Sequence, residues 1–291
     1  MTTFRRPGGR PGTAVAGRGQ VGSLLREWRE RRRISQLDLA ITAEVSTRHL
    51  SFVETGRSRP SREMVLRLGE HLEVPLRERN HLLLAAGYAP VYPETPLDEP
   101  EMSAARAALR KVLAGHEPYP AVVVDRRWNL VEANSAVSVL TDGAAAELLA
   151  PPANMVKIAL HPDGLAPRVR NLAELRADLL GRLRRQYQAT ADPELAELLD
   201  EVRGYPCDQP EPVDEDAASG AVFVPLRLVH RGVELSFFST IATFGTALDV
   251  TLAELAIESF YPADPRTGEY LRDLRETGGR IEDAGSRNRD R

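Results

Sequence analysis

The sequence predicts a mainly α protein with an α+β second domain, in which five short helices precede an antiparallel sheet with flanking helices. Three observations support this fold class. Apolar residues recur at helical spacing up to residue 89, prolines interrupt the chain at 90–100, and strand-like apolar runs begin near residue 119. At 291 residues the chain is long enough for about two domains with separate cores.

Each helix expected within residues 20–89 has a recognisable start. The first follows the i, i+3, i+4, i+7 apolar pattern of Val21, Leu24, Leu25 and Trp28. The later starts are capping residues or prolines, namely Ser35, Ser46, Pro60-Ser61 and Pro75. We expect the second helix to be short and apolar through Leu37, Leu39, Ala40 and Ile41. Leu50 and Val53 should anchor the third.

The rest of the chain mixes helical and strand patterns. Residues 90–100 hold four prolines and should form an extended linker. The elements expected beyond it are a helix at 101–115, strands at 119–125 and 128–133, helices within 171–203 that break at Asp192-Pro193, and strands at 221–230, 233–244 and 252–261. Asn134 should cap a helix. We expect a domain at 101–263, a disordered basic arm at 1–19 and a polar, disordered tail at 264–291.

Charge divides the chain into a basic head and an acidic body. Residues 1–90 carry 16 Lys and Arg against 9 Asp and Glu, whereas residues 91–291 carry 22 against 33. The net charge of −4 conceals this split. A polyanion such as nucleic acid would therefore meet the head, because phosphates attract Arg and Lys and repel carboxylates. Chance clustering in an Arg-rich arm is the alternative.

Several function classes lack support in the sequence. No apolar run approaches the ~20 residues of a membrane helix, and the N-terminus has no apolar signal segment, so we expect a cytoplasmic protein. Cys207 is the single cysteine, and the six histidines show no metal-ligand spacing. No nucleophile elbow or phosphate loop is present. We therefore predict no catalytic residue, no metal site and no cofactor.

The segment from Ile34 to Ser61 has the pattern of a helix-turn-helix, with a short helix, a tight turn and a second helix. It resembles the lambda-repressor-like, XRE-type regulators. The residues that carry the resemblance are Ser35, Gln36, Leu39, Ala40, Val45, Ser46, Glu54, Gly56, Arg57 and Pro60. The resemblance spans about 65 residues and implies a five-helix head that binds operator DNA.

The resemblance also implies roles for individual residues. Gln36, Arg57 and Arg59 would hold phosphates, whereas Thr47, Arg48 and Ser51 would face base edges, with His49 a weaker candidate. An arginine can bind guanine through two hydrogen bonds, which contributes about 1–3 kcal/mol of base discrimination. Arg48 fits either base reading or a phosphate contact, since its position on the helix does not fix its depth in the groove.

Roughly residues 100–263 resemble the MmyB-like ligand-binding domain, which has a PAS-like sheet. The carriers are Pro120–Asp125, Trp128-Asn129-Leu130, Asn134, Leu160–Gly164, Asn171-Leu172, Leu183–Arg185, Phe244–Thr246 and Asp249. The resemblance implies an apolar pocket for a small, lipid-like effector. Its candidate lining residues are Val124, Leu130, Met155, Ile158, Leu183 and Phe237, although core packing explains such residues without a ligand. Arg182, Arg184 and Arg185 fit either a ligand carboxylate or a solvated face.

These features favour a one-component transcription regulator. A small effector would bind the second domain and change how two heads meet an operator. A homodimer is expected because one helix-turn-helix buries little DNA surface. An enzyme fused to a DNA-targeting head, or a protein-interaction module, remains as an alternative for the second domain.

Overall fold

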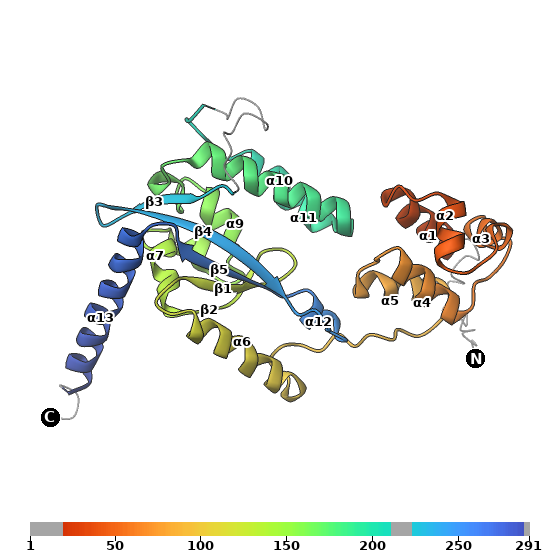
Figure 1. Ribbon diagram of the computed structural model, residues 1–291, viewed down its shortest axis with the longest axis horizontal. Helices are drawn as coiled ribbons and strands as arrows, with labels where there is room; N and C mark the ends of the chain where they lie inside the picture. The colour runs from red at the N-terminus through yellow and green to blue at the C-terminus, as the bar shows by residue number, and fades with distance from the viewer. Residues whose placement is uncertain (1–19, 211–222, 288–291) are drawn as a thin grey trace, which may run out of the picture. The chain divides into compact units, whose positions relative to one another are not determined.

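The computed structural model describes residues 20–210 and 223–287 (Figure 1). The basic arm expected at 1–19 lies outside this part. The chain divides into two compact units, Met1–Tyr92 and Pro93–Arg291, and each unit has its own hydrophobic core. The division falls within the proline-rich segment at 90–100.

The first unit contains the five predicted helices. They are α1 (Gln20–Arg31), α2 (Gln36–Thr42), α3 (Thr47–Glu54), α4 (Arg62–His71) and α5 (Leu76–Ala85). The predicted caps are present, because the side chains of Ser35, Ser46 and Ser61 accept backbone N–H bonds at the starts of α2, α3 and α4. Each cap satisfies an amide that a helix start would otherwise leave without a partner.

Close approach of α1 and α3 depends on a glycine. A Cβ atom at Gly22 would lie 2.1 Å from the carbonyl oxygen of Val53, so no larger residue fits there without displacing backbone. Leu50 and Val53 are buried as predicted, but the second helix differs from expectation. It buries Leu39 and Ala40 and exposes Leu37 and Ile41, because a short surface helix packs only one of its sides against the core.

The second unit contains five strands and both long and short helices. The strands are β1 (Ala121–Val124), β2 (Leu130–Ala133), β3 (Leu226–His230), β4 (Val233–Thr243) and β5 (Ala256–Pro262). The helices are η1 (Pro100–Met102), α6 (Ser103–Gly115), η2 (Ser135–Val137), α7 (Ser138–Thr141), α8 (Ala146–Leu149), α9 (Met155–Leu160), η3 (Ala166–Arg168), α10 (Leu172–Thr190), α11 (Pro193–Arg203), α12 (Val250–Ala253) and α13 (Pro265–Arg287).

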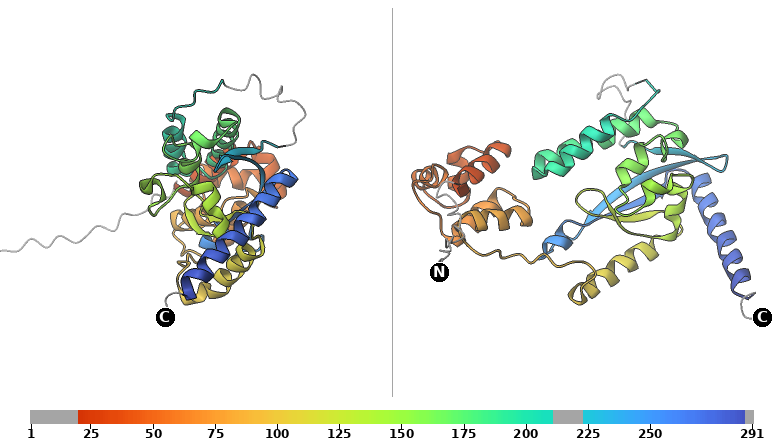
Figure 2. Two further views of the ribbon diagram at one scale, coloured as in Figure 1. Left: turned by 90° about the vertical axis from the view of Figure 1, so that its left-hand side faces the viewer. Right: turned by 180° about the vertical axis from the view of Figure 1, so that it is seen from behind.

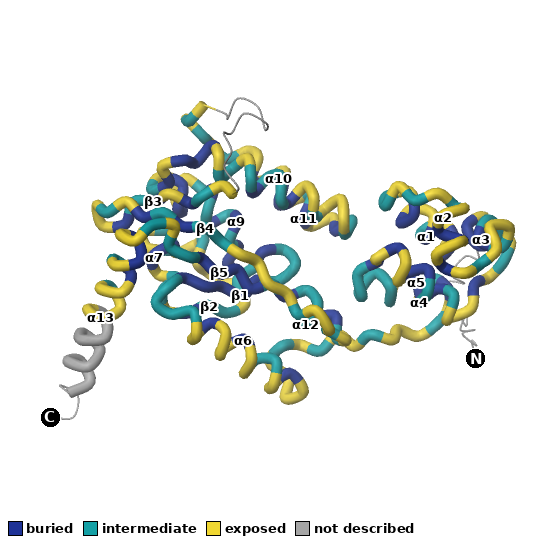
Figure 3. Tube along the Cα trace, viewed as in Figure 1, coloured by how far each residue is buried: buried dark blue, intermediate teal, exposed yellow. Residues whose placement is uncertain are grey.

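The strands form one antiparallel sheet in the order β2-β1-β5-β4-β3. Helices α9, α10 and α11 lie on one face of this sheet and α6 on the other (Figures 1 and 2). The larger core, between the sheet and α9–α11, includes Phe237 and Phe260. The smaller core packs Leu109 and Leu113 of α6 against β1 and β5. Figure 3 shows most of β1 and β5, the strands between these two cores, as buried.

The β1–β2 turn is longer than expected. Asp125 Oδ1 accepts the backbone N–H groups of Arg127 and Asn129, and Trp128 has a φ of 68°. A tryptophan in the left-handed region is unusual and belongs to the turn, so β2 begins at Leu130 rather than Trp128. This turn places the indole on the same side of the sheet as α10, where its nitrogen donates to Gln186 Oε1.

Three further expectations are corrected. The strand predicted at 252–261 begins at Ala256, because the Asp249 side chain caps the short helix α12 in front of it. Asn134 caps no helix through its side chain, which instead accepts the Ala121 N–H and donates to the Tyr119 carbonyl. The tail expected at 264–291 is not disordered throughout, since it contains α13, whose Leu271 is buried in the larger core of the second unit.

No helix among residues 20–210 and 223–287 is both long enough and apolar enough to cross a bilayer. Within the same ranges, no cluster of three or more His, Cys, Asp or Glu residues could bind a metal ion.

Candidate DNA interface and ligand cavity

The helix-turn-helix of the first unit consists of α2, a short turn and α3. The turn closes through a bond from Val45 N to the Ala40 carbonyl and a left-handed Glu44 with a φ of 52°. Buried Leu50 and Val53 hold one side of α3 against the core. The opposite side of α3 is therefore available to a partner.

The exposure of the side chains on α3 agrees with this packing. Thr47 and Arg48, in the first turn of α3, are exposed, and His49 and Ser51 are half-buried. The Arg48 guanidinium lies 5.4 Å from the centre of the Phe52 ring, and the exposed Arg57 lies 5.9 Å from the same ring. A half-buried aromatic ring thus has two cations around it, one at each end of α3. We call Thr47, Arg48, Phe52 and Arg57 the α3 ridge.

Two other predicted phosphate ligands have protein partners. Gln36 Nε2 donates to Glu54 Oε2 at 2.7 Å, which uses one of its two N–H groups. The Arg59 guanidinium donates twice to the Ala86 carbonyl, at 3.0 and 2.6 Å, and lies over the Tyr88 ring. Arg59 therefore closes the end of α5 and is not part of the α3 ridge.

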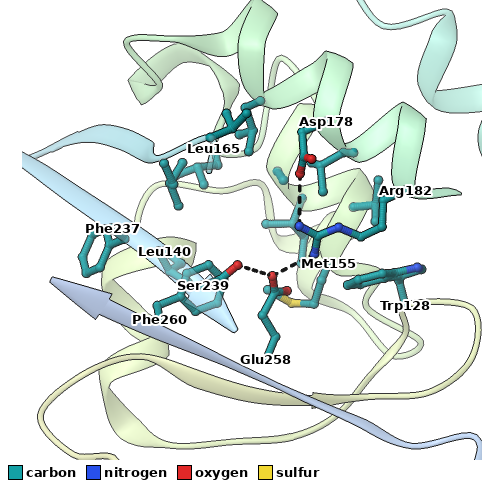
Figure 4. A pocket seen from close by; sticks show the side chains of 17 residues that line it. Trp128, Leu140, Met155, Leu165, Asp178, Arg182, Phe237, Ser239, Glu258 and Phe260 are labelled. Carbon is teal, nitrogen blue, oxygen red and sulfur yellow. Dashed lines mark hydrogen bonds and ion pairs between the residues drawn. The ribbon is translucent and has the colours of Figure 1, made fainter. Parts of the chain in front are cut away.

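A cavity in the second unit lies between the sheet and helices α9 and α10 (Figure 4). Its volume is about 70 Å³. The wall is mainly apolar and consists of Trp128, Leu140, Met155, Val156, Ile158, Ala159, Leu165, Leu175, Leu179, Val224, Leu226, Phe237 and Phe260, with Asp178, Arg182, Ser239 and Glu258 as its polar members. Apolar surroundings with few polar groups are typical of small-molecule sites.

The polar members of the wall contact one another. Arg182 donates to Asp178 Oδ2 at 3.0 Å and to Glu258 Oε1 at 3.2 Å. Ser239 donates to the same Glu258 oxygen at 2.8 Å. The Arg182 guanidinium also lies 5.5 Å from the centre of the Trp128 ring. Figure 4 shows these side chains directed toward one another, with Asp178 and Arg182 on α10 and Glu258 on β5.

A second depression of about 580 Å³, with both polar and apolar lining residues, lies elsewhere in this unit around His230. His230 is buried, with Nε2 at 3.2 Å from Asp142 Oδ2 and Nδ1 at 2.8 Å from the Tyr270 hydroxyl. Burial lowers the pKa of His230, and the positive charge of Arg231 lowers it further, which outweighs the opposite effect of Asp142.

Comparison with protein families decides the identity of the second unit. Residues 105–274, more than half of the chain, match the family model described as the MmyB-like transcription regulator ligand binding domain. The chain belongs to this family. Residues 20–82 match a helix-turn-helix domain. The protein is accordingly a DNA-binding helix-turn-helix transcription regulator with an MmyB-like ligand-binding domain, as its motifs predicted.

Two similar solved structures each cover about a quarter of this chain or less. One is the clp gene regulator ClgR from Corynebacterium glutamicum, with 27% identity over 24% of this chain and 87% of that chain and a TM-score of 0.22. The other is the restriction-modification controller protein C.AhdI from Aeromonas hydrophila, with 29% identity over 21% and 94% and a TM-score of 0.21. No curated protein matches this chain.

Half of the residues predicted to line the effector pocket lie at the cavity of this MmyB-like domain. Met155, Ile158 and Phe237 line it. The others, Val124, Leu130 and Leu183, are not in its wall and belong to the surrounding core.

It was not predicted from the sequence that Asp178, Arg182, Ser239 and Glu258 form one polar group, although two features of the sequence indicate it. Asp178, Arg182 and Gln186 follow one another at a spacing of four in a Leu-rich helix, which places them on one face. Glu258 interrupts the apolar strand β5 at a position whose strand neighbours Ala256 and Phe260 point to the same face. A charge at such a position marks a polar group inside the core layer.

Proposed function

We propose that this regulator binds its operator through the α3 ridge and that a small, largely apolar effector in the α9–α10 cavity controls that binding. Thr47 and Arg48 would contact base edges, and Arg57 would contact a phosphate. Ser51, His49 and the remaining N–H of Gln36 would add polar contacts to the same duplex. Support comes from the exposure of Thr47 and Arg48 in the first turn of α3 and of Arg57 shortly after the helix ends.

The effector part of the proposal depends on the cavity. The interior of a protein is normally filled by its own side chains. An unfilled, mainly apolar space with four polar residues in its wall therefore favours a ligand site over simple packing. An effector larger than this space would displace side chains of α9 or α10. Such a displacement is a route by which binding changes the protein beyond the cavity.

We also propose that the regulator acts as a homodimer. Two heads would read half-sites about 34 Å apart or a multiple of that, which doubles the buried DNA surface. Light scattering after size exclusion would reveal the dimer. A particle with the mass of one 32.1 kDa chain would refute it.

The experiment uses the full chain. Operator sequences are first selected from random duplexes, and the affinity for the selected operator is then measured with and without a small-molecule extract of cells. We expect the extract to change the affinity of the unaltered protein. Ala159→Phe fills the cavity and should abolish the change, because Ala159 lines the space. Ala108→Phe, on the exposed side of α6, is the matched control and should respond like the unaltered protein.

The outcomes separate the two halves of the proposal. No selected sequence at low salt would refute operator binding. Operator binding that never responds to the extract, or that responds equally in the Ala159→Phe variant, would refute control through the cavity. Turnover of an added compound by the full chain, without any effect on DNA binding, would support the enzyme alternative instead.

A further inference from the structure

The charged side chains in the cavity wall do not balance. Two carboxylates, Asp178 and Glu258, face one guanidinium, Arg182, and among the described lining residues these three are the ionic groups. Their formal sum is one negative charge in a wall whose other residues, apart from Ser239, are apolar. An effector that enters this space meets a net negative site, and low polarity around the site strengthens its effect.

Glu258 is the buried member of the cluster. The residue is 8% exposed, so its carboxylate has lost most of its water. Within the described residues its hydrogen bonds come from Arg182 and Ser239, and both end on Oε1. Oε2 therefore retains the capacity to accept a bond. An ionised carboxylate oxygen with remaining acceptor capacity in a mainly apolar wall favours a hydrogen-bond donor from the ligand, because such an oxygen can only accept.

Arg182 is already engaged on several sides. It donates to Asp178 and Glu258, and its guanidinium lies against the Trp128 ring. The ring in turn is held by the bond from its indole nitrogen to Gln186. The bonds to Asp178 and Glu258 use two of the five N–H groups of Arg182, and a ligand carboxylate that reached the remaining groups would lie close to two protein carboxylates. The cluster thus opposes an acid even though it contains an arginine.

We infer that the cavity selects effectors that combine an apolar body with an uncharged or cationic hydrogen-bond donor, such as a hydroxyl or an amine, and that it discriminates against carboxylic acids. The donor group binds Glu258, and the apolar body contacts Met155, Ile158 and Phe237. This inference rests on the proposed function, since it specifies the chemical class of the effector for the same cavity.

The test compares three series of straight-chain probes of about four to ten carbons, a length range suited to a small apolar site. The series are 1-alkylamines, 1-alkanols and alkanoates, measured near pH 7 where amines are cationic and alkanoates anionic. Binding to the full chain is followed by calorimetry. We expect the best amine or alcohol to bind at least about tenfold more tightly than the alkanoate of equal length, because the net negative charge of the wall repels a second anion.

Variants assign the selectivity to Glu258. Glu258→Gln keeps the shape and removes the excess negative charge, so the preference for amine over alkanoate should narrow by about tenfold. Glu132→Gln is the matched control, since Glu132 is also a strand residue paired with an arginine but lies outside the cavity. The control should keep the preference of the unaltered protein.

A purely structural Glu258, which only joins α10 to the sheet, predicts equal loss of all three series in the Glu258→Gln variant. That result, or alkanoates that bind the unaltered protein as well as amines do, would overturn the inference and leave the proposed function intact. If Glu258→Gln fails to fold, the ratio measured on the unaltered protein still decides. Failure of every series to bind would count against the proposed effector cavity itself.

Discussion

Arg29 and Glu54 form a buried ion pair with two hydrogen bonds, from Nε to Oε1 at 2.7 Å and from Nη2 to Oε2 at 2.9 Å. The pair joins the end of α1 to the end of α3, and Gln36 at the start of α2 donates to the same carboxylate. Three helices of the head therefore meet at Glu54, which is 6% exposed. The orientation of α3, and with it of Arg48, depends on this carboxylate.

Loss of the Glu54 carboxylate should destabilise the head severely. Glu54→Ala leaves the Arg29 guanidinium buried without its counter-charge, and removal of one partner from a buried pair costs about 3–5 kcal/mol. Urea denaturation of the full chain, followed through Trp28 in the core of the head, would measure the loss.

Two further variants distinguish charge from packing. Glu27→Ala removes an exposed partner of Arg31 and should change stability by about 0.5 kcal/mol or less. The double variant Arg29→Met with Glu54→Leu removes both charges and should recover much of the stability lost in Glu54→Ala. Equal destabilisation by the single and double variants would contradict the importance of the unpaired charge.

Arg48→Ala should reduce discrimination between operator and scrambled duplexes. Under the proposed function Arg48, which is exposed in the first turn of α3, contacts a base edge, and its loss should cost the operator complex about 1–3 kcal/mol. Titration of both duplexes at one salt concentration measures the effect. Equal weakening on both sequences would instead assign Arg48 to the phosphate backbone.

Arg57 and Arg59 should separate a DNA contact from a structural role. Arg57→Ala should lower the slope of log affinity against log salt by about 0.9, the value for one phosphate contact, and leave stability nearly unchanged. Arg59→Ala should keep that slope and lower stability by about 1–2 kcal/mol, because the Ala86 carbonyl loses a charged donor. Salt titrations and thermal melts of both variants check this contrast, and a reversed pattern would contradict it.

His230 should make the stability of the ligand-binding domain depend on pH. Its pKa is lowered in the fold from an ordinary value of 6.5, so the unfolded chain binds a proton more readily. Stability from the neutral imidazole is therefore complete above about pH 6.5 and declines as the pH falls through and below that value. The melting temperature should fall between about pH 7.5 and 5.5, less steeply in His230→Gln.

The exposed His81 supplies the control for this prediction. His81→Gln removes an exposed histidine of the first unit and should leave the pH dependence of the ligand-binding domain as in the unaltered protein. Parallel slopes for His230→Gln and the unaltered protein would show that other groups cause the effect.

Local sequence patterns determined the head. Helical spacing, the serine caps and the small residues of the turn act within a few positions of one another, so the five helices and the exposed Thr47 and Arg48 could be predicted directly. The break at Asp192-Pro193 was predictable for the same reason, since Asp192 caps α11 and Pro193 opens it. These features depend on neighbours in the chain and need no knowledge of the fold.

Tertiary structure decided the partners of charged side chains. Nothing in the sequence indicated that Arg59 would lie 2.6 Å from the Ala86 carbonyl, or that Arg182 would pair with Glu258 rather than only with solvent. The pair of Arg182 with Glu258 spans 76 positions of sequence, and that of Arg29 with Glu54 spans 25. A charged side chain has many candidate partners along the sequence. Only the packing of the helices and the sheet brings one of them close, because a buried charge must be compensated by a neighbour in space.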